Sequence, residues 1–214
     1  ANPASGKDIR RLISGASVFD NQEKRNIVRR AVLGAIAAGE RCFRHVPDAH
    51  GIAASALADA APGADVAPVP LELTDSALDT SRGAAKMCEE GCGAVLVLGG
   101  DGTNRAAALG WSDLPVVAVS TGTNNVFPRM VEGTLAGLAG GLVSTGKVRL
   151  EDASTQVKTI RIGIEGEPDD LALIDAALRA RSSVHGQCGT RIRCGSSSSR
   201  APNRPRWVCH RSRL

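Results

Sequence analysis

Residues 94–104 read Ala94-Val-Leu-Val-Leu-Gly-Gly-Asp-Gly-Thr-Asn104, and this stretch decides the fold class. Residues 94–98 are apolar at every position, which is typical of a strand covered on both faces. A glycine-rich turn follows at once, and residues 105–109 favour a helix. A buried strand that turns directly into a helix indicates a βαβ unit and a parallel sheet.

The same alternation extends in both directions from this stretch. Short apolar runs at residues 41–46, 66–73, 94–98 and 116–120 predict strands, and helix-forming residues dominate 26–38, 51–60 and 78–90. A further helix fits residues 131–143, although its glycines count against it. We therefore predict an α/β fold with a doubly wound parallel sheet.

A different kind of sheet is expected further along. Thr159-Ile-Arg-Ile-Gly-Ile-Glu165 alternates polar and apolar residues, which predicts a half-exposed strand. We place an α/β nucleotide-binding domain at 1–148 and the start of a second, β-rich domain at 149–178. Residues 1–8 resemble a loop that leaves a strand and enters a helix, so the first strand of the sheet is expected to be missing from this chain.

Composition excludes several functional classes. The 214 residues carry a net charge of +4, but the nine arginines after Asp175 leave residues 1–175 acidic overall. The basic pI is therefore no sign of a nucleic-acid partner, and 2% aromatic residues offer few platforms for stacking bases. Because no membrane-length apolar window and no leader-like start occur, we expect a cytoplasmic protein without a membrane span.

Residues 179–214 differ from the rest of the chain. They hold Ser196-Ser-Ser-Ser199 and show no apolar periodicity. We interpret them either as a disordered basic tail or as a frameshifted stretch of GC-rich coding sequence.

The turn at residues 99–103 is the first candidate for chemistry. Gly99, Gly100 and Gly102 permit positive φ and close approach of a ligand, and the N-terminus of the following helix favours an anion such as a phosphate. Asp101 could hold Mg²⁺ on a polyphosphate or accept a proton from an attacking hydroxyl. The alternative is an Asp-Gly turn that merely caps the helix.

Two further segments carry small polar groups. Thr121-Gly-Thr-Asn-Asn125 follows the neighbouring strand and offers hydroxyls and amides to a phosphate, a ribose or a hydroxylated acceptor. Asn2-Pro-Ala-Ser-Gly6 does not belong to a P-loop. Ala1 stands where that motif has its first glycine, and Asp8 stands where it has a Ser or Thr after the lysine, here Lys7. The turn after the buried strand does not match the dinucleotide-binding fingerprint either, because Arg105 stands where that motif has its third glycine.

In this order, Asn2-Pro-x-Ser-Gly6, Gly99-Gly-Asp-Gly-Thr103 and Ser120-Thr-Gly-Thr-Asn-Asn125 resemble the superfamily of NAD kinases and diacylglycerol-type lipid kinases. The sequence around these motifs looks most like that of bacterial ATP-NAD kinase-like proteins of the acetoin-catabolism protein X group. The resemblance covers roughly residues 1–178. It implies an N-terminal α/β domain and a C-terminal β-rich domain, with ATP and its acceptor between them.

The resemblance also implies roles for individual residues. Asp101 matches the catalytic, Mg²⁺-linked aspartate. The implied nucleotide-binding residues are Gly99, Gly100, Gly102, Thr103, Asn104, Thr121, Gly122, Thr123, Asn124, Asn125, Asn2, Ser5 and Gly6. The expected donor is Mg·ATP, the expected acceptor is NAD, and the full-length relatives are expected to be homo-oligomers.

The acceptor stays open at this point, because the Asn-Glu pair usual in NAD kinases is absent. A lipid kinase and a non-catalytic nucleotide-binding regulator are the alternatives. With its first strand and most of its second domain expected to be missing, we expect this 214-residue chain to be an inactive fragment.

Overall fold

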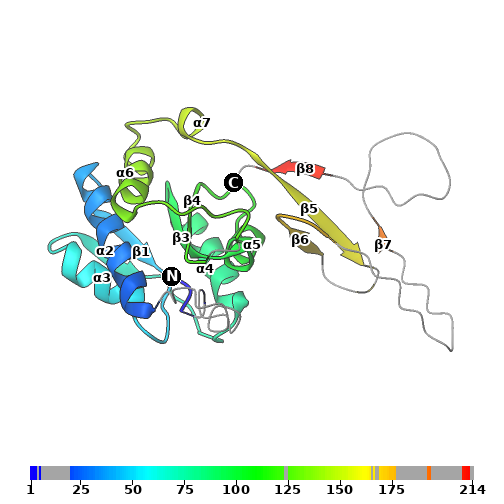
Figure 1. The fold of residues 1–214 in the computed structure, drawn as a ribbon, viewed down its shortest axis with the longest axis horizontal. Helices are drawn as coiled ribbons and strands as arrows, with labels where there is room; N and C mark the ends of the chain where they lie inside the picture. Colours follow the sequence, from blue (N-terminus) through cyan, green and yellow to red (C-terminus); the bar gives the residue numbers. More distant parts are fainter. Residues whose placement is uncertain are drawn as a thin grey trace.

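The computed structural model describes residues 1–3, 5, 20–122, 125–164, 166, 169–176, 192–193 and 209–212. Helices and strands alternate through its larger part (Figure 1). In chain order this part contains α2 (Asn21–Ala37), β1 (Cys42–His45), α3 (Ile52–Ala60), β2 (Asp65–Pro68), α4 (Ala77–Glu89), β3 (Val95–Gly99), α5 (Asp101–Gly110), β4 (Val116–Ser120) and α6 (Gly133–Ser144). Among the described residues, no helix is long and apolar enough to cross a membrane.

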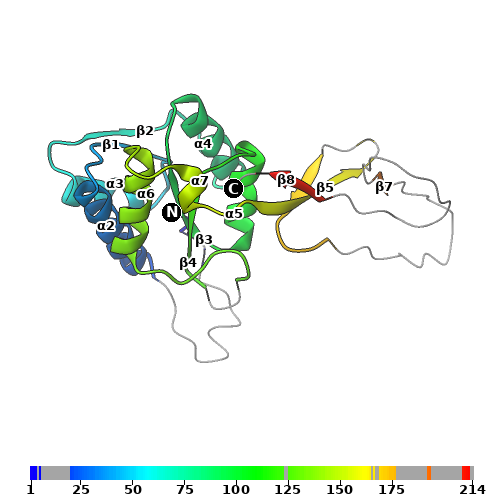
Figure 2. The ribbon, with the colours of Figure 1, turned by 90° about the horizontal axis from the view of Figure 1, so that it is seen from above.

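Strand β3 lies at the centre of this alternation and contributes to two cores. Val95 and Val97 pack into a core with α4 and α5, whereas Leu98 packs into a core with α2 and α3. Figure 2 shows the two helix groups on opposite sides of β3 and β4. Because both faces of β3 are covered, an apolar residue is needed at each of its positions.

The strands form parallel pairs, as the sequence predicted. β1 pairs with β2 in register from Cys42↔Asp65, and β3 pairs with β4 from Val95↔Val116. The α/β fold class is thereby confirmed. The structure differs from the expected single sheet in one respect. Within the described part of the chain, no hydrogen bonds join β1 to β3, so the two parallel pairs are separate.

Element boundaries differ from prediction in two places. Helix α2 begins at Asn21, earlier than expected, because the Asp20 carboxylate caps it by accepting the N–H of Glu23 at 2.7 Å. Strand β2 ends at Pro68, earlier than expected. Pro68 and Pro70 have no backbone N–H to continue a ladder.

Beyond α6 the chain changes character. After α7 (Leu150–Ala153), β5 (Val157–Ile164) pairs antiparallel with β6 (Asp170–Ala172), β7 (Ile192–Arg193) and β8 (Cys209–Ser212). The antiparallel pairing agrees with the expected second kind of sheet, and the division into domains stays a prediction. Apart from β7 and β8, the interpretations of residues 179–214 fall outside the described residues.

Close packing against α2 explains why α6 contains glycine at Gly137. A Cβ on Gly137 would lie 1.7 Å from the carbonyl oxygen of Ala31, and one on Gly34 of α2 would lie 2.1 Å from that of Thr134. The backbones of α2 and α6 therefore touch directly. This contact outweighs the low helix propensity that counted against residues 131–143.

We predict that Gly137→Ala destabilises the chain by about 1–3 kcal/mol, because the added methyl group must push the two helices apart. Gly140→Ala is the matched control within α6. A Cβ there meets only Val117 Cγ2 at 3.7 Å and Ala94 Cβ at 3.8 Å, so helix propensity should stabilise it slightly. Urea unfolding followed by circular dichroism measures both variants. Equal stability of the two would contradict the direct backbone contact.

Candidate functional site

The polar segments singled out from the sequence meet at the carboxyl ends of β3 and β4. Gly99 is paired with Ser120 in the parallel register, so the two following segments leave the sheet side by side. Ligands of open α/β sheets bind at this edge. The site is therefore built from the beginning of α5 and from the loop that follows β4.

Asp101 is the first residue of α5, with Gly100 as the N-cap. Its carboxylate accepts the backbone N–H of Phe127 at 2.8 Å and that of Val126 at 3.1 Å. These partners lie in the loop after β4, not in the first turn of α5. Asp101 therefore does not act as a simple helix cap. Its carboxylate joins the turn after β3 to the loop after β4.

Gly99 and Gly100 serve close approach and not positive φ. Gly99, Gly100 and Gly102 do not belong to the described glycines with positive φ, which corrects one expectation. A Cβ on Gly99 would lie 2.6 Å from Thr103 Oγ1, and one on Gly100 would lie 2.9 Å from Asn125 Oδ1. The turn is tight because these neighbouring side chains lie against its backbone.

Asn2 and Ser5 bring the N-terminal segment to the same edge. The backbone N–H of Asn2 donates to Leu98 O at 3.0 Å, and its side-chain amide donates to Thr103 Oγ1 at 2.8 Å. Thr121 Oγ1 donates to Ser5 Oγ at 2.7 Å. Three segments that are far apart in the sequence are thereby joined by side-chain hydrogen bonds.

The remaining predicted residues divide into supporting and accessible groups. Asn104 is 2% exposed and donates to Gly100 O at 2.9 Å, so it holds the turn. Asn125 donates to Ser120 Oγ at 2.8 Å, beside Gly122. Gly102 is exposed, and a Cβ there would meet nothing within 4 Å. Gly6, Thr123 and Asn124 lie outside the described residues.

Lys24 of α2 was missed by the sequence analysis. Its side chain is fully buried, and its ammonium group donates to Pro3 O at 2.8 Å and to Asn21 Oδ1 at 3.4 Å. It fixes the N-terminal segment against the start of α2. A single lysine in an amphipathic helix gives no sequence signal for such a role.

Arg105 connects α5 to the antiparallel sheet. Its guanidinium group contacts the Asp170 carboxylate and donates to Leu171 O at 2.5 Å. Leu171 itself packs into the core on the α4 and α5 side. The helix that begins at the candidate site is thus held by β6 of the following sheet.

The arrangement suits a phosphorylated ligand. The N-terminus of α5 carries a partial positive charge, and the half-buried hydroxyls of Ser5 and Thr103 lie close by, whereas Thr121 is fully buried behind them. Among the described residues, no cluster of three or more His, Cys, Asp or Glu side chains forms a metal site. Asp101 is the carboxylate at this edge that could share a cation with a ligand.

Comparison with known proteins gives a consistent result. The chain is 36% identical over 191 residues to the acetoin catabolism protein X of Cupriavidus necator, an alignment that covers 83% of this chain. It covers 53% of the relative, so the chain spans about half of that protein's length. No solved structure matches the chain significantly. A model of the ATP-NAD kinase N-terminal domain matches residues 31–147, from α2 to just beyond α6 and including the turn at Asp101. The chain belongs to the ATP-NAD kinase family.

Proposed function

We propose that this chain forms the nucleotide-binding part of an ATP-dependent kinase that phosphorylates a hydroxyl group, with the 2′-hydroxyl of NAD as the acceptor. The observation that carries the proposal is the meeting of three polar segments around Asp101 at the carboxyl ends of β3 and β4. Family membership supports kinase chemistry. The position of the site at a sheet edge supports nucleotide binding.

The roles follow from the chemistry of phosphoryl transfer, in which positioning and charge stabilisation dominate. The N–H groups at the start of α5 and the Thr103 hydroxyl would bind the phosphates of ATP. Asn2 and Asn104 hold that turn in shape. The loop after β4, held by Asp101, would carry groups to the ribose or to the acceptor.

Asp101 has the chemistry for two roles. Its carboxylate could accept the proton of the attacking hydroxyl, or it could bind Mg²⁺ together with the phosphates and water. Mg²⁺ would neutralise charge on the phosphates. One carboxylate suffices for such a site, because the substrate phosphates supply further oxygen ligands.

We predict that Asp101→Asn lowers turnover roughly a hundredfold or more when the matching change is made in the full-length acetoin catabolism protein X. The amide oxygen of Asn can still accept the N–H of Phe127, so the loops should stay joined. Turnover is measured as ADP release at several Mg²⁺ concentrations. Thermal unfolding of Asp101→Asn in this chain checks the fold.

The matched control is Glu89→Gln at the end of α4, which leads into the opposite end of β3. Glu89 is exposed and forms a surface ion pair with Lys86, which contributes little to stability. Loss of this carboxylate charge, made by the matching change in the full-length relative, should leave its turnover unchanged. Near-normal turnover of the Asp101→Asn protein would assign Asp101 to loop positioning alone.

The acceptor is tested with a panel that separates the competing classes. We expect the full-length relative to release ADP with NAD and not with diacylglycerol in detergent micelles. The reverse preference would make it a lipid kinase. Saturable ATP binding without ADP release for any acceptor would favour a nucleotide-binding regulator.

We also predict that the 214-residue chain binds Mg·ATP but gives no acceptor-dependent turnover. Its turn at Asp101 depends on β3 and α5, which are present, whereas the relative is about twice as long and would supply the wall that orients the acceptor. Calorimetric titration measures binding and an ADP assay with NAD measures turnover. Turnover comparable to that of the relative would refute this.

A further inference from the structure

Arg105 lies one helical turn after Asp101 in α5, so the two residues are neighbours on the helix surface. Figure 1 shows β6 beside this helix. The guanidinium group of Arg105 contacts the Asp170 carboxylate through Nη2 and donates from Nε to Leu171 O at 2.5 Å. The helix that carries Asp101 is therefore bound by two adjacent residues of β6.

The guanidinium group makes both contacts in one fixed orientation. Nε and Nη2 lie in the same plane, so acceptors bound to both define a direction as well as a distance. The Asp170 carboxylate is itself held, because its Oδ1 accepts the backbone N–H of Leu171 at 2.7 Å. The contact of Arg105 therefore sets the orientation of α5 against β6.

This contact matters more for orientation than for stability. The side chain of Arg105 is 37% exposed and that of Asp170 is 47% exposed. Ion pairs that are this open to water contribute little to the free energy of unfolding. We therefore expect the loss of Arg105 to change the geometry of α5 more than the stability of the chain.

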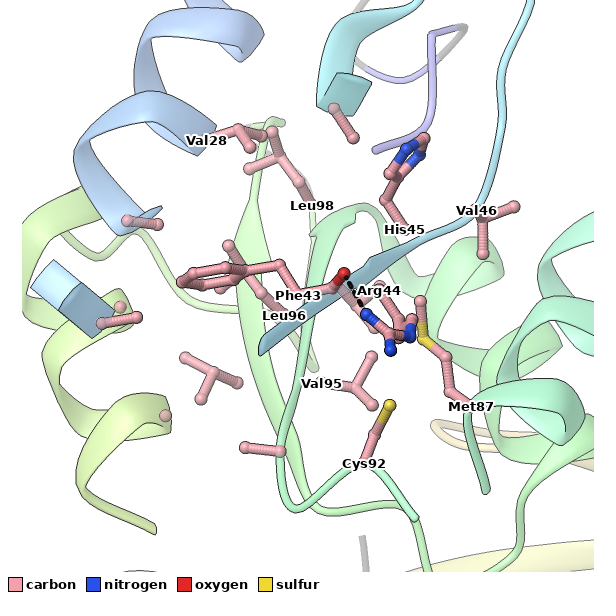
Figure 3. A pocket seen from close by; sticks show the side chains of 18 of the residues that line it. Val28, Phe43, Arg44, His45, Val46, Met87, Cys92, Val95, Leu96 and Leu98 are labelled. Carbon is pink, nitrogen blue, oxygen red and sulfur yellow. Dashed lines mark hydrogen bonds between the residues drawn. The ribbon is translucent and has the colours of Figure 1, made fainter. Parts of the chain in front are cut away.

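A second connection leads from β6 back to the Asp101 carboxylate. Leu171 of β6 packs into the core that contains Met87 and Val95, two residues that line the pocket drawn in Figure 3. Phe127 packs against the same core, and its backbone N–H donates to Asp101 Oδ1 at 2.8 Å. β6 is thus connected to both sides of this hydrogen bond, to α5 through the ion pair and to the loop after β4 through the core.

The Asp101 carboxylate depends on these connections because its own helix does not hold it. Its hydrogen bonds go to the N–H groups of Val126 and Phe127 in the loop after β4. A rotation of α5, or a displacement of that loop, lengthens both bonds. The direction of the carboxylate therefore follows from how the helix and the loop are held relative to each other.

We propose that Arg105 is a positioning residue of the candidate site. By binding Asp170 and Leu171 O, it holds α5 against β6. In this orientation the Asp101 carboxylate meets the N–H of Phe127. The proposal deepens the proposed function and rests on it, because in a kinase the antiparallel sheet would keep this carboxylate in place for Mg·ATP.

The experiment replaces Arg105 in this chain and measures hydrogen exchange at single amides. In Arg105→Gln, exchange of the Phe127 amide should become at least about fivefold faster, because its acceptor moves. Exchange of the Val95 amide, which donates to Pro115 O at 2.8 Å, should stay unchanged. The thermal unfolding midpoint should fall by no more than about 4 °C.

Two further variants test the geometry of the contact. Arg105→Lys keeps the charge but loses the planar fork, so it should not restore slow exchange at Phe127. Asp170→Asn should accelerate that exchange as Arg105→Gln does. The double variant should be no faster than either single variant, because all three remove the same contact. If Arg105→Gln does not fold, the result for Asp170→Asn decides.

The matched control is Arg149→Gln. Arg149 also forms exposed ion pairs, but its partners, Glu151 and Asp152, lie only two and three positions away in the sequence. These pairs do not hold α5 or the loop after β4. The control should leave exchange of the Phe127 amide unchanged.

Calorimetric titration of the same variants with Mg·ATP connects the contact to the site. The affinity should fall at least about threefold in Arg105→Gln and stay unchanged in Arg149→Gln. If the unmodified chain binds no Mg·ATP, the proposed function fails, whereas exchange at Phe127 still tests the positioning role.

Three results would overturn the positioning role. The first is unchanged exchange at Phe127 in Arg105→Gln. The second is equal acceleration at Val95, which would mean a general loss of stability. The third is faster exchange at Phe127 with unchanged affinity for Mg·ATP in a chain that binds it.

Discussion

The parallel pairing of β3 with β4 is the constraint on which the site depends. Neighbouring strands lie about 4.8 Å apart, so segments that leave paired residues begin within contact distance. Gly99 is paired with Ser120, and the Asp101 carboxylate then reaches the N–H groups of Val126 and Phe127. A shift of the register by one residue would invert the faces of β4 and move Ser120 away from this edge.

Those parts of the fold whose cause is local could be predicted from the sequence. The apolar run at β3, the turn after it and helix α5 depend on neighbouring residues, and each was placed to within a few residues. The start of α2 was also within reach, because Asp20 and Glu23 have the spacing of a capping box. The three polar segments could be named from their composition and order, although their binding roles stay predictions.

Contacts between distant segments could not be predicted in the same way. Ser5 and Thr121 are 116 positions apart, and nothing in either segment indicates that their hydroxyls meet. Lys24 has the sequence environment of a solvated residue, yet its side chain is fully buried and its ammonium group donates to Pro3 O. The glycines of α6 are a third example: helix propensity disfavours them, and only contact with α2 explains Gly137.

Asn2 connects the edge of β3 to the geometry of the site. Its backbone N–H belongs to the edge of β3, its side-chain amide holds Thr103, and its carbonyl oxygen accepts the Ser5 hydroxyl at 2.9 Å. Each bond contributes only about 0.5–1.5 kcal/mol, but all of them depend on the position of one residue. The backbone position of Asn2 therefore also governs the hydroxyls of Thr103, Ser5 and, through Ser5, Thr121. The geometry of the turn at residues 99–103 is therefore tied to the position of Asn2 at the edge of β3.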